Sequence, residues 1–189
     1  KQFIHTELSE TNPNDSLLVH GYYFMSILYL INDSPDSTIN YLQNLIDDYP
    51  VRAPVYIQYN VLYLPLVNLY KERKEHEKVI SVLMDEHKVT KYHNNTKRLA
   101  SIHFEIGFQY KALGNLDSLI VYLEKAYEYY AGIGDEEMMP KTKGWIQGMY
   151  MLRGAEITEP KEKLDYFIKG IKVSESLQDT VQILLNYST

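Results

Sequence analysis

Apolar residues recur every three or four positions along most of the chain, which is the spacing of an amphipathic α-helix. Shorter stripes of this kind lie within 39–46 and 79–83. No segment alternates apolar and polar residues with the period of two that a half-buried strand requires. The pattern therefore predicts an all-α protein without a sheet. The clearest stripe consists of Leu116, Leu119, Ile120, Leu123, Ala126, Tyr127 and Tyr130.

Turn-forming and capping residues divide these stripes into about eight helices joined by short turns, in which a long helix is followed by a shorter one. A ninth helix is expected to begin near Asp179 and to be cut short by the end of the sequence. Pro65 falls within a helical stripe, where it should bend the chain or break a hydrogen bond. The main punctuation lies at Ser34-Pro35, Pro50, Pro54, Asn94-Asn95, Gly114-Asn115, Gly132 to Asp135, Thr158 and Pro160.

Two series of landmarks recur along the chain with the same period. Tyr29, Tyr70 and Tyr110 are 41 and 40 residues apart, and so are Leu42, Leu83 and Leu123. Phe167 follows Leu123 by 44 residues, which indicates a fourth unit with a longer turn. A shared period in independent landmarks predicts tandem helical hairpins. We expect the units to cover approximately 16–50, 54–92, 95–131 and 136–177, followed by a partial helix at 178–189.

The segment 100–131 contains a small residue, Gly107, followed three positions later by an aromatic residue, Tyr110. Leu113-Gly114-Asn115 comes next, and then Leu123 with Glu124-Lys125-Ala126. With these residues the segment resembles a tetratricopeptide repeat (TPR), in which the small residue allows close helix contact, the glycine turn joins two helices and the last residues belong to the second helix. In the fourth unit the corresponding residues are Trp145, Gly148, Phe167 and Gly170, although Lys163 replaces a small residue.

The resemblance implies a fold class: an all-α, right-handed superhelical solenoid of about four TPR-like hairpins plus a truncated terminal helix. Residues 1–189 would form a single repeat domain, because each hairpin buries its second face only by stacking on a neighbour. The spacing of 40 residues or more is longer than is usual for the family. It is closer to the long repeats of some bacterial regulators, including peptide-sensing ones.

The family's first helices line a concave face that commonly binds a ligand, and its groove positions can be carried over to this sequence. The alternative is that these side chains pack against neighbouring helices. An acidic-tail clamp is disfavoured, because only one of the groove residues, Asn68, is polar in the required way. The implied groove residues are Tyr23, Ile27, Leu64, Asn68, Phe104 and Phe108, with Lys71 and Lys111 near the rim.

Composition and charge narrow the classes of partner. The 189 residues carry a net charge of −6 and contain no cysteine. The charge argues against a nucleic-acid binder and against an anionic membrane surface. The missing cysteines exclude disulfides, thiol catalysis and cysteine-ligated metals. The longest apolar stretch, 17–31, is shorter than the roughly 18 residues of a membrane span, so we expect no membrane insertion.

Residue patterns that carry catalysis are missing from the sequence. It has no phosphate-binding glycine loop, no Gly-x-Ser-x-Gly and no His-Glu-x-x-His. The six histidines do not have the spacing of a zinc site. We therefore expect no catalytic residue, no metal site and no cofactor.

These observations favour a non-enzymatic module that binds a protein or peptide segment in an apolar and aromatic groove. Such a module would be the scaffold or sensory part of a larger bacterial regulator. The alternative is a structural module that self-associates, for example as a homodimer, within an exported scaffold or lipoprotein. The sequence starts at Lys1 and stops within a helical pattern, so we expect a fragment of a longer protein. The compartment stays open between cytoplasm and export, with export slightly favoured.

One further pattern concerns modification. Asp15-Ser16-Leu17, Asp36-Ser37-Thr38, Asp117-Ser118-Leu119 and Asp179-Thr180-Val181 share the form Asp, Ser or Thr, then an apolar residue or Thr. This form resembles the O-glycosylation acceptor of exported proteins in some gut bacteria. The alternative is helix capping, because Asp and Ser are favoured at helix starts and all four lie near predicted starts.

Overall fold

The computed structural model describes residues 24, 27–28, 34–48 and 62–187. Of the predicted groove residues, Tyr23 lies outside this described part, as does most of the first helix of the first unit. Every regular element in the described part is a helix, and none of its residues forms a strand. Contacts divide the chain into two compact units, Lys1–Asn95 and Thr96–Thr189.

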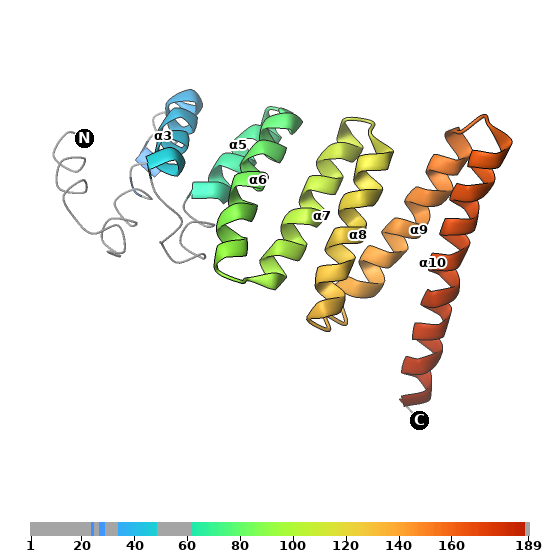
Figure 1. The fold of residues 1–189 in the computed structure, drawn as a ribbon. Helices are drawn as coiled ribbons and strands as arrows, with labels where there is room; N and C mark the ends of the chain where they lie inside the picture. Colours follow the sequence, from blue (N-terminus) through green and yellow to red (C-terminus); the bar gives the residue numbers. More distant parts are fainter. Residues whose placement is uncertain (1–23, 25–26, 29–33, 49–61, 188–189) are drawn as a thin grey trace. The chain divides into compact units, whose positions relative to one another are not determined.

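The first compact unit contains helices α3 (Pro35–Asp48), α5 (Leu64–Glu72) and α6 (His76–Tyr92). A short turn joins α5 to α6, so that these two helices form a hairpin, and α3 packs against α5 (Figure 1). The core residues are at most 2% exposed and come from all three helices: Leu42, Leu66, Tyr70, Val79 and Leu83.

The second compact unit contains α7 (Thr96–Ala112), α8 (Leu116–Gly132), α9 (Met138–Glu156) and α10 (Pro160–Tyr187). Each helix packs on the next along the chain, which gives two successive hairpins, α7–α8 and α9–α10 (Figure 1). The stripe predicted on α8 is confirmed, because its members are buried except Tyr127, which is half-buried. The all-α helical repeat is therefore confirmed. Its main core cluster consists of Leu116, Leu119, Ile120, Leu123, Ile146, Met149 and Tyr150.

One turn geometry recurs at positions 74, 94, 114 and 134. Lys74, Asn94, Gly114 and Gly134 have φ of 59°, 56°, 74° and 66°, the left-handed conformation that ends a helix. In each case the N–H of the next residue donates to the carbonyl five positions earlier, at 2.9–3.2 Å. Each of α6, α7 and α8 accordingly has 17 residues. The expected alternation of long and short helices is wrong, because the turns are evenly spaced.

Side-chain caps start the helices that follow the two glycine turns. Asn115 accepts a hydrogen bond from the Ser118 N–H at 2.9 Å at the start of α8. Asp135 accepts one from the Met138 N–H at 2.9 Å before α9. Both restarts were predicted from the sequence, since Asn and Asp beside a glycine satisfy the unpaired N–H groups of a new helix.

Two helix boundaries differ from the prediction. α10 runs from Pro160 to Tyr187 without a break, so the helix start expected near Asp179 is wrong. Asp and Thr can cap a helix, but neither ends the preceding one, and no glycine or proline lies between Ile171 and Tyr187. Pro65 lies in the first turn of α5, after the π-helical residues 62–63, where a missing N–H costs little.

Glycines mark the closest contacts between paired helices. A Cβ on Gly107 of α7 would lie 3.4 Å from the Leu119 side chain and 3.5 Å from the Tyr122 Cβ, which confirms the predicted close contact with α8. In the fourth repeat unit, the assignment of Gly148 as the close-contact residue is wrong, because a Cβ on Gly148 would meet nothing within 4 Å. Gly154 takes this role instead, facing Phe167 and Tyr166 of α10.

Candidate functional site

The first part of the candidate site is one face of α7. Phe104, Phe108 and Lys111 are four and three residues apart, so they project from the same side of the helix. The two phenylalanine rings contact each other, with centroids 4.8 Å apart. Both are half-buried and pack against the main core cluster of the second unit. They are therefore partly core residues and partly surface residues.

Trp145 of α9 completes this surface. Its ring meets the Phe108 ring edge-on, with centroids 5.0 Å apart, and 39% of Trp145 is exposed. The Lys111 Nζ lies 4.7 Å from the Trp145 centroid and 5.7 Å from that of Phe108. We call Phe104, Phe108, Lys111 and Trp145 the aromatic patch.

Lys111 gives the aromatic patch its charge. The side chain is exposed, and its ammonium group lies over two ring faces, whose negative quadrupole attracts a cation. No carboxylate of the described residues is within ion-pair distance of Lys111. Glu105 of the same helix pairs instead with Arg98, at 3.1 Å. The patch thus combines exposed aromatic area with one cation that can accept an anionic group.

The predicted groove residues of the first compact unit lie on α5 and earlier in the sequence. Leu64 is half-buried, whereas Asn68 and Lys71 are exposed, with the same spacing along α5 as Phe104, Phe108 and Lys111 along α7. Ile27 is half-buried. Because the two units are separate bodies, a single groove over both sets stays a prediction.

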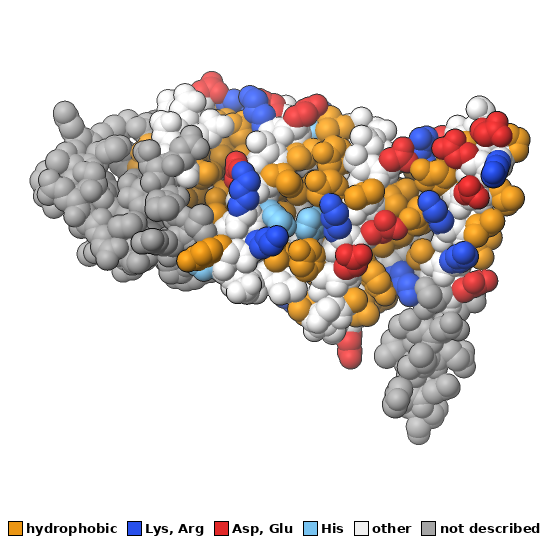
Figure 2. Space-filling view, viewed as in Figure 1, with side chains coloured by type: hydrophobic (Ala, Val, Ile, Leu, Met, Phe, Trp, Pro, Cys, Tyr) orange, Lys and Arg blue, Asp and Glu red, His pale blue; other side chains and the backbone are white. Residues whose placement is uncertain are grey.

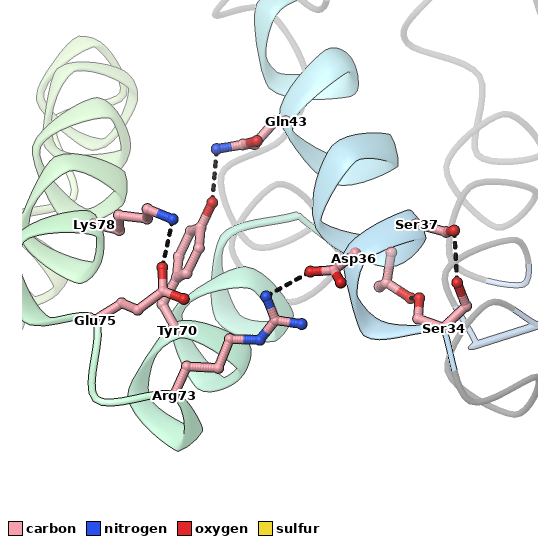
Figure 3. Close-up of polar contacts among 9 residues, drawn as sticks. Ser34, Asp36, Ser37, Gln43, Tyr70, Arg73, Glu75 and Lys78 are labelled. Carbon is pink, nitrogen blue, oxygen red and sulfur yellow. Dashed lines mark hydrogen bonds and ion pairs between the residues drawn. The ribbon is translucent and has the colours of Figure 1, made fainter.

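A cavity of about 310 Å³ lies among α3, α5 and α6, next to the Tyr70 side chain. Gln43 donates to the Tyr70 hydroxyl oxygen at 2.7 Å, and Lys78 lies 5.3 Å from the Tyr70 ring centroid while pairing with Glu75 (Figure 3). Burial raises the pKa of the Tyr70 hydroxyl above its usual value. These polar groups bind one another rather than point to a ligand, and the Gln43–Tyr70 hydrogen bond holds α3 on the α5–α6 hairpin.

A wider, open cavity of about 660 Å³ lies on the second unit among α8, α9 and α10. Its rim carries two glutamates and two lysines, so that its formal charge is balanced. Glu124 already accepts a hydrogen bond of 2.5 Å from the Tyr150 hydroxyl. Burial and then this hydrogen bond raise the pKa of Tyr150. The cavity shows no preference for a ligand of one charge. It is lined by Glu124, Tyr127, Glu128, Lys143, Ile146, Lys172 and Val173.

Asp117 of α8 ties three helices together. Arg153 of α9 donates to both of its carboxylate oxygens, at 2.9 and 3.0 Å, and the Tyr166 hydroxyl of α10 donates at 2.9 Å. The hydrogen bonds from Arg153 hold the pKa of Asp117 below its usual value. Burial opposes this effect, and the Tyr166 hydrogen bond adds to it. Asp117 is therefore ionised at neutral pH.

We expect Asp117→Asn to destabilise the second unit by about 0.5–1 kcal/mol at pH 7, because the bidentate ion pair is lost. A carboxylate with a lowered folded-state pKa stabilises above its unfolded pKa of about 3.9, and this contribution disappears as the pH falls through the folded value. The difference from wild type should therefore shrink below about pH 4. Urea unfolding at pH 7 and pH 3 measures it, with exposed Glu136→Gln as the control. A difference independent of pH would contradict this role.

Two of the four modification motifs lie in described first turns. Ser37 of α3 and Ser118 of α8 are half-buried, and the Ser34 hydroxyl donates to the Ser37 hydroxyl oxygen at 2.6 Å. The aspartates of both motifs are engaged, Asp36 with Arg73 and Asp117 with Arg153. Both aspartates therefore make contacts between helices, and the cap of α8 is Asn115 rather than a residue of the motif. Residues 15–17 lie outside the described part.

Within the described residues no three His, Asp or Glu side chains are close enough to hold a metal ion. His103 is buried and stacks on Tyr129, with ring centroids 5.3 Å apart. No helix of the described part combines the length and the apolar content needed to cross a membrane. Acidic and basic side chains are interspersed over the face of α8, α9 and α10 in Figure 2.

No protein-family model and no curated protein matches the sequence. Solved structures do match the fold. The apo form of RapI superposes with a TM-score of 0.53 at 17% identity, covering 94% of this chain and 63% of RapI. The chain thus spans less than two thirds of RapI's length.

Two other matching structures contain tetratricopeptide or similar repeats. TPR-like repeats of a Podosopora anserina protein assigned as a kinesin light chain give a TM-score of 0.55 at 11% identity, covering 96% of this chain and 84% of that one. A Pyrococcus horikoshii signal-transduction ATPase with a tetratricopeptide repeat sensor gives a TM-score of 0.57 at 11% identity. The match covers 96% of this chain and 27% of that protein. The chain therefore has the TPR-like helical repeat fold.

Proposed function

We propose that this TPR-like chain binds a segment of another protein or a peptide at the aromatic patch, without catalysing a reaction. The observation that carries the proposal is Trp145, which is 39% exposed beside Phe108 and beneath the Lys111 ammonium group. Exposed tryptophans in such settings are common anchors of protein interfaces. A helical repeat supports this role because its packed hairpins hold the side chains of a binding face rigidly.

The chemistry of the patch indicates the type of segment. The rings of Phe108 and Trp145 offer apolar area for an aromatic or aliphatic anchor. Lys111 offers a cation for an Asp, a Glu or a terminal carboxylate next to that anchor. We therefore infer a segment with an apolar anchor and a neighbouring acidic group. A role as the scaffold or sensory part of a larger bacterial regulator is the wider form of the same proposal.

Selection of random peptides against the intact chain, followed by anisotropy titration of the selected peptides with a fluorescent label, tests the proposal. Lys111→Glu should weaken their binding about tenfold, and Trp145→Ala by tenfold or more. These residues are better targets than Phe104 and Phe108, because charge at either phenylalanine would also disturb the core. Val121→Glu, at an exposed site on α8, is the matched control and should bind like wild type.

Two results would overturn the proposal. One is that the selected peptides bind both patch variants as tightly as wild type. The other is that Val121→Glu weakens binding as much as the patch variants do. Helical circular dichroism of each variant confirms that the fold is retained.

A further inference from the structure

An exposed apolar stripe runs along α10. Leu164, Ile168 and Ile171 are 57%, 40% and 51% exposed. At 100° per residue they lie within about 60° of one another around the helix, so they form one face. Gly170, Tyr166 and Val173 face α9 or its core cluster from the other side of α10. Figure 2 shows hydrophobic side chains along this outer edge of α10.

The same positions are covered in the preceding hairpin. Tyr122 of α8 and Tyr166 of α10 are 44 residues apart, and their Cβ atoms occupy equivalent places against Gly107 and Gly154. With this offset Leu164 corresponds to Ile120, and Ile171 corresponds to Tyr127. In α8, Ile120 is 4% exposed, and Tyr127 packs on the cluster that includes residues of α9. The stripe on α10 therefore has the register of a face that another helix covers.

The charges beside the stripe indicate which helix covers it. Lys161, Asp165, Lys172 and Glu175 are exposed, and in the described part of the chain none of the four forms an ion pair. If a second α10 lies antiparallel with Ile168 facing its own copy, Asp165 approaches Lys172 of the copy, and Lys161 approaches Glu175. All four lie on the same flank of the stripe, and the antiparallel two-fold axis brings this flank of one helix beside the same flank of its copy. The charge pattern thus complements itself in the antiparallel orientation.

We propose that two copies of this chain associate through α10, antiparallel, with Ile168 at the two-fold axis. Leu164 and Ile171 extend the apolar contact on either side of the axis. An isologous contact of this kind uses the same patch on both subunits and closes at a dimer. The interface is small, so the dimer should dissociate on dilution. The proposal is independent of the aromatic patch, which lies on α7 and α9.

Cysteine cross-linking provides the sharpest test, because the chain has no cysteine of its own. Under mild oxidation Ile168→Cys should give mostly disulfide-linked dimer, since the two Cα atoms approach within bonding reach at the axis. Leu164→Cys should give little, because its own copy lies about eight residues, or roughly 12 Å, away along the helix. An equimolar mixture of Leu164→Cys and Lys172→Cys should form the heterodimer.

Analytical sedimentation of chains without an introduced cysteine, over about 1 µM to 1 mM protein, measures the association directly. Wild type should shift from monomer to dimer, and Ile168→Glu should weaken the association at least tenfold, whereas Val121→Glu should not. A wild-type monomer at every concentration, together with no cross-link from Ile168→Cys, would overturn the proposal. Equal cross-linking by Leu164→Cys and Ile168→Cys would overturn the antiparallel arrangement.

Discussion

Leu123→Ala should lower the free energy of unfolding of the second unit by about 2–5 kcal/mol. Leu123 is fully buried in the cluster that joins α8 to α9, so truncation removes apolar contacts and leaves a cavity. Urea unfolding followed by Trp145 fluorescence measures the change in the relevant unit, because Trp145 is the only tryptophan and lies on α9.

Val121→Ala is the matched control, two residues away on α8. Val121 is 46% exposed, so its truncation should change the free energy of unfolding by no more than about 0.5 kcal/mol. Similar losses for the two variants would show that the buried stripe of α8 has been assigned to the wrong face.

Gly154→Ala should destabilise the second unit by about 1–3 kcal/mol, although alanine is the better helix former. A Cβ at this position would lie 2.7 Å from the Phe167 Cε1 and 3.3 Å from the Tyr166 Cβ. Contacts this short force α9 and α10 apart or turn the Phe167 ring away from its preferred rotamer. Thermal unfolding monitored by circular dichroism should give a lower midpoint for the variant.

Gly148→Ala provides the control on the same helix. This glycine is exposed and a Cβ would meet nothing within 4 Å, so alanine should stabilise α9 by about 0.5–1 kcal/mol. The two substitutions should therefore shift the melting midpoint in opposite directions. A gain at both positions would contradict the close approach of the α9–α10 hairpin at Gly154.

Local signals in the sequence predicted the helices and turns of the described chain well. The buried stripe of α8 follows directly from its three- and four-residue spacing, and the Gly114-Asn115 turn from the conformational freedom of glycine and the capping ability of asparagine. The even spacing of the turns was missed, because Lys74 adopts positive φ although it is neither glycine nor asparagine. A lysine in this conformation reveals a left-handed turn only in the structure.

The fourth unit shows where pattern matching fails. Its longer spacing leaves open how the unit aligns with the preceding repeats, so that either Gly148 or Gly154 could be the close-contact residue. Which glycine faces α10 depends on how α9 is rotated against its partner, and that rotation is set by the packing of large side chains such as Phe167. Residues that can start a helix do not show that the preceding helix has ended. The prediction of a new helix near Asp179 therefore missed that α10 continues through this residue.

The candidate site was predicted in part. The family resemblance implied Phe104, Phe108 and Lys111 as groove residues, and their side chains lie together on one face of α7. Their role in binding stays a prediction. Trp145 was noted only as a repeat residue, because it contacts Phe108 of another helix, 37 residues earlier in the sequence. Helical periodicity assigns a residue to a face of its own helix, but it does not identify the neighbour across that face.

The order of contacts in the second unit bears on how it folds. α7 packs on α8, α8 on α9, and α9 on α10, so the main contacts join segments that are adjacent in sequence. Little chain entropy is lost in closing such short loops, and proteins of low contact order fold within microseconds to milliseconds. Nucleation can start at either hairpin and spread to its neighbour. We therefore expect a fast main refolding phase, and partly unfolded states in which one hairpin has opened while the other stays intact.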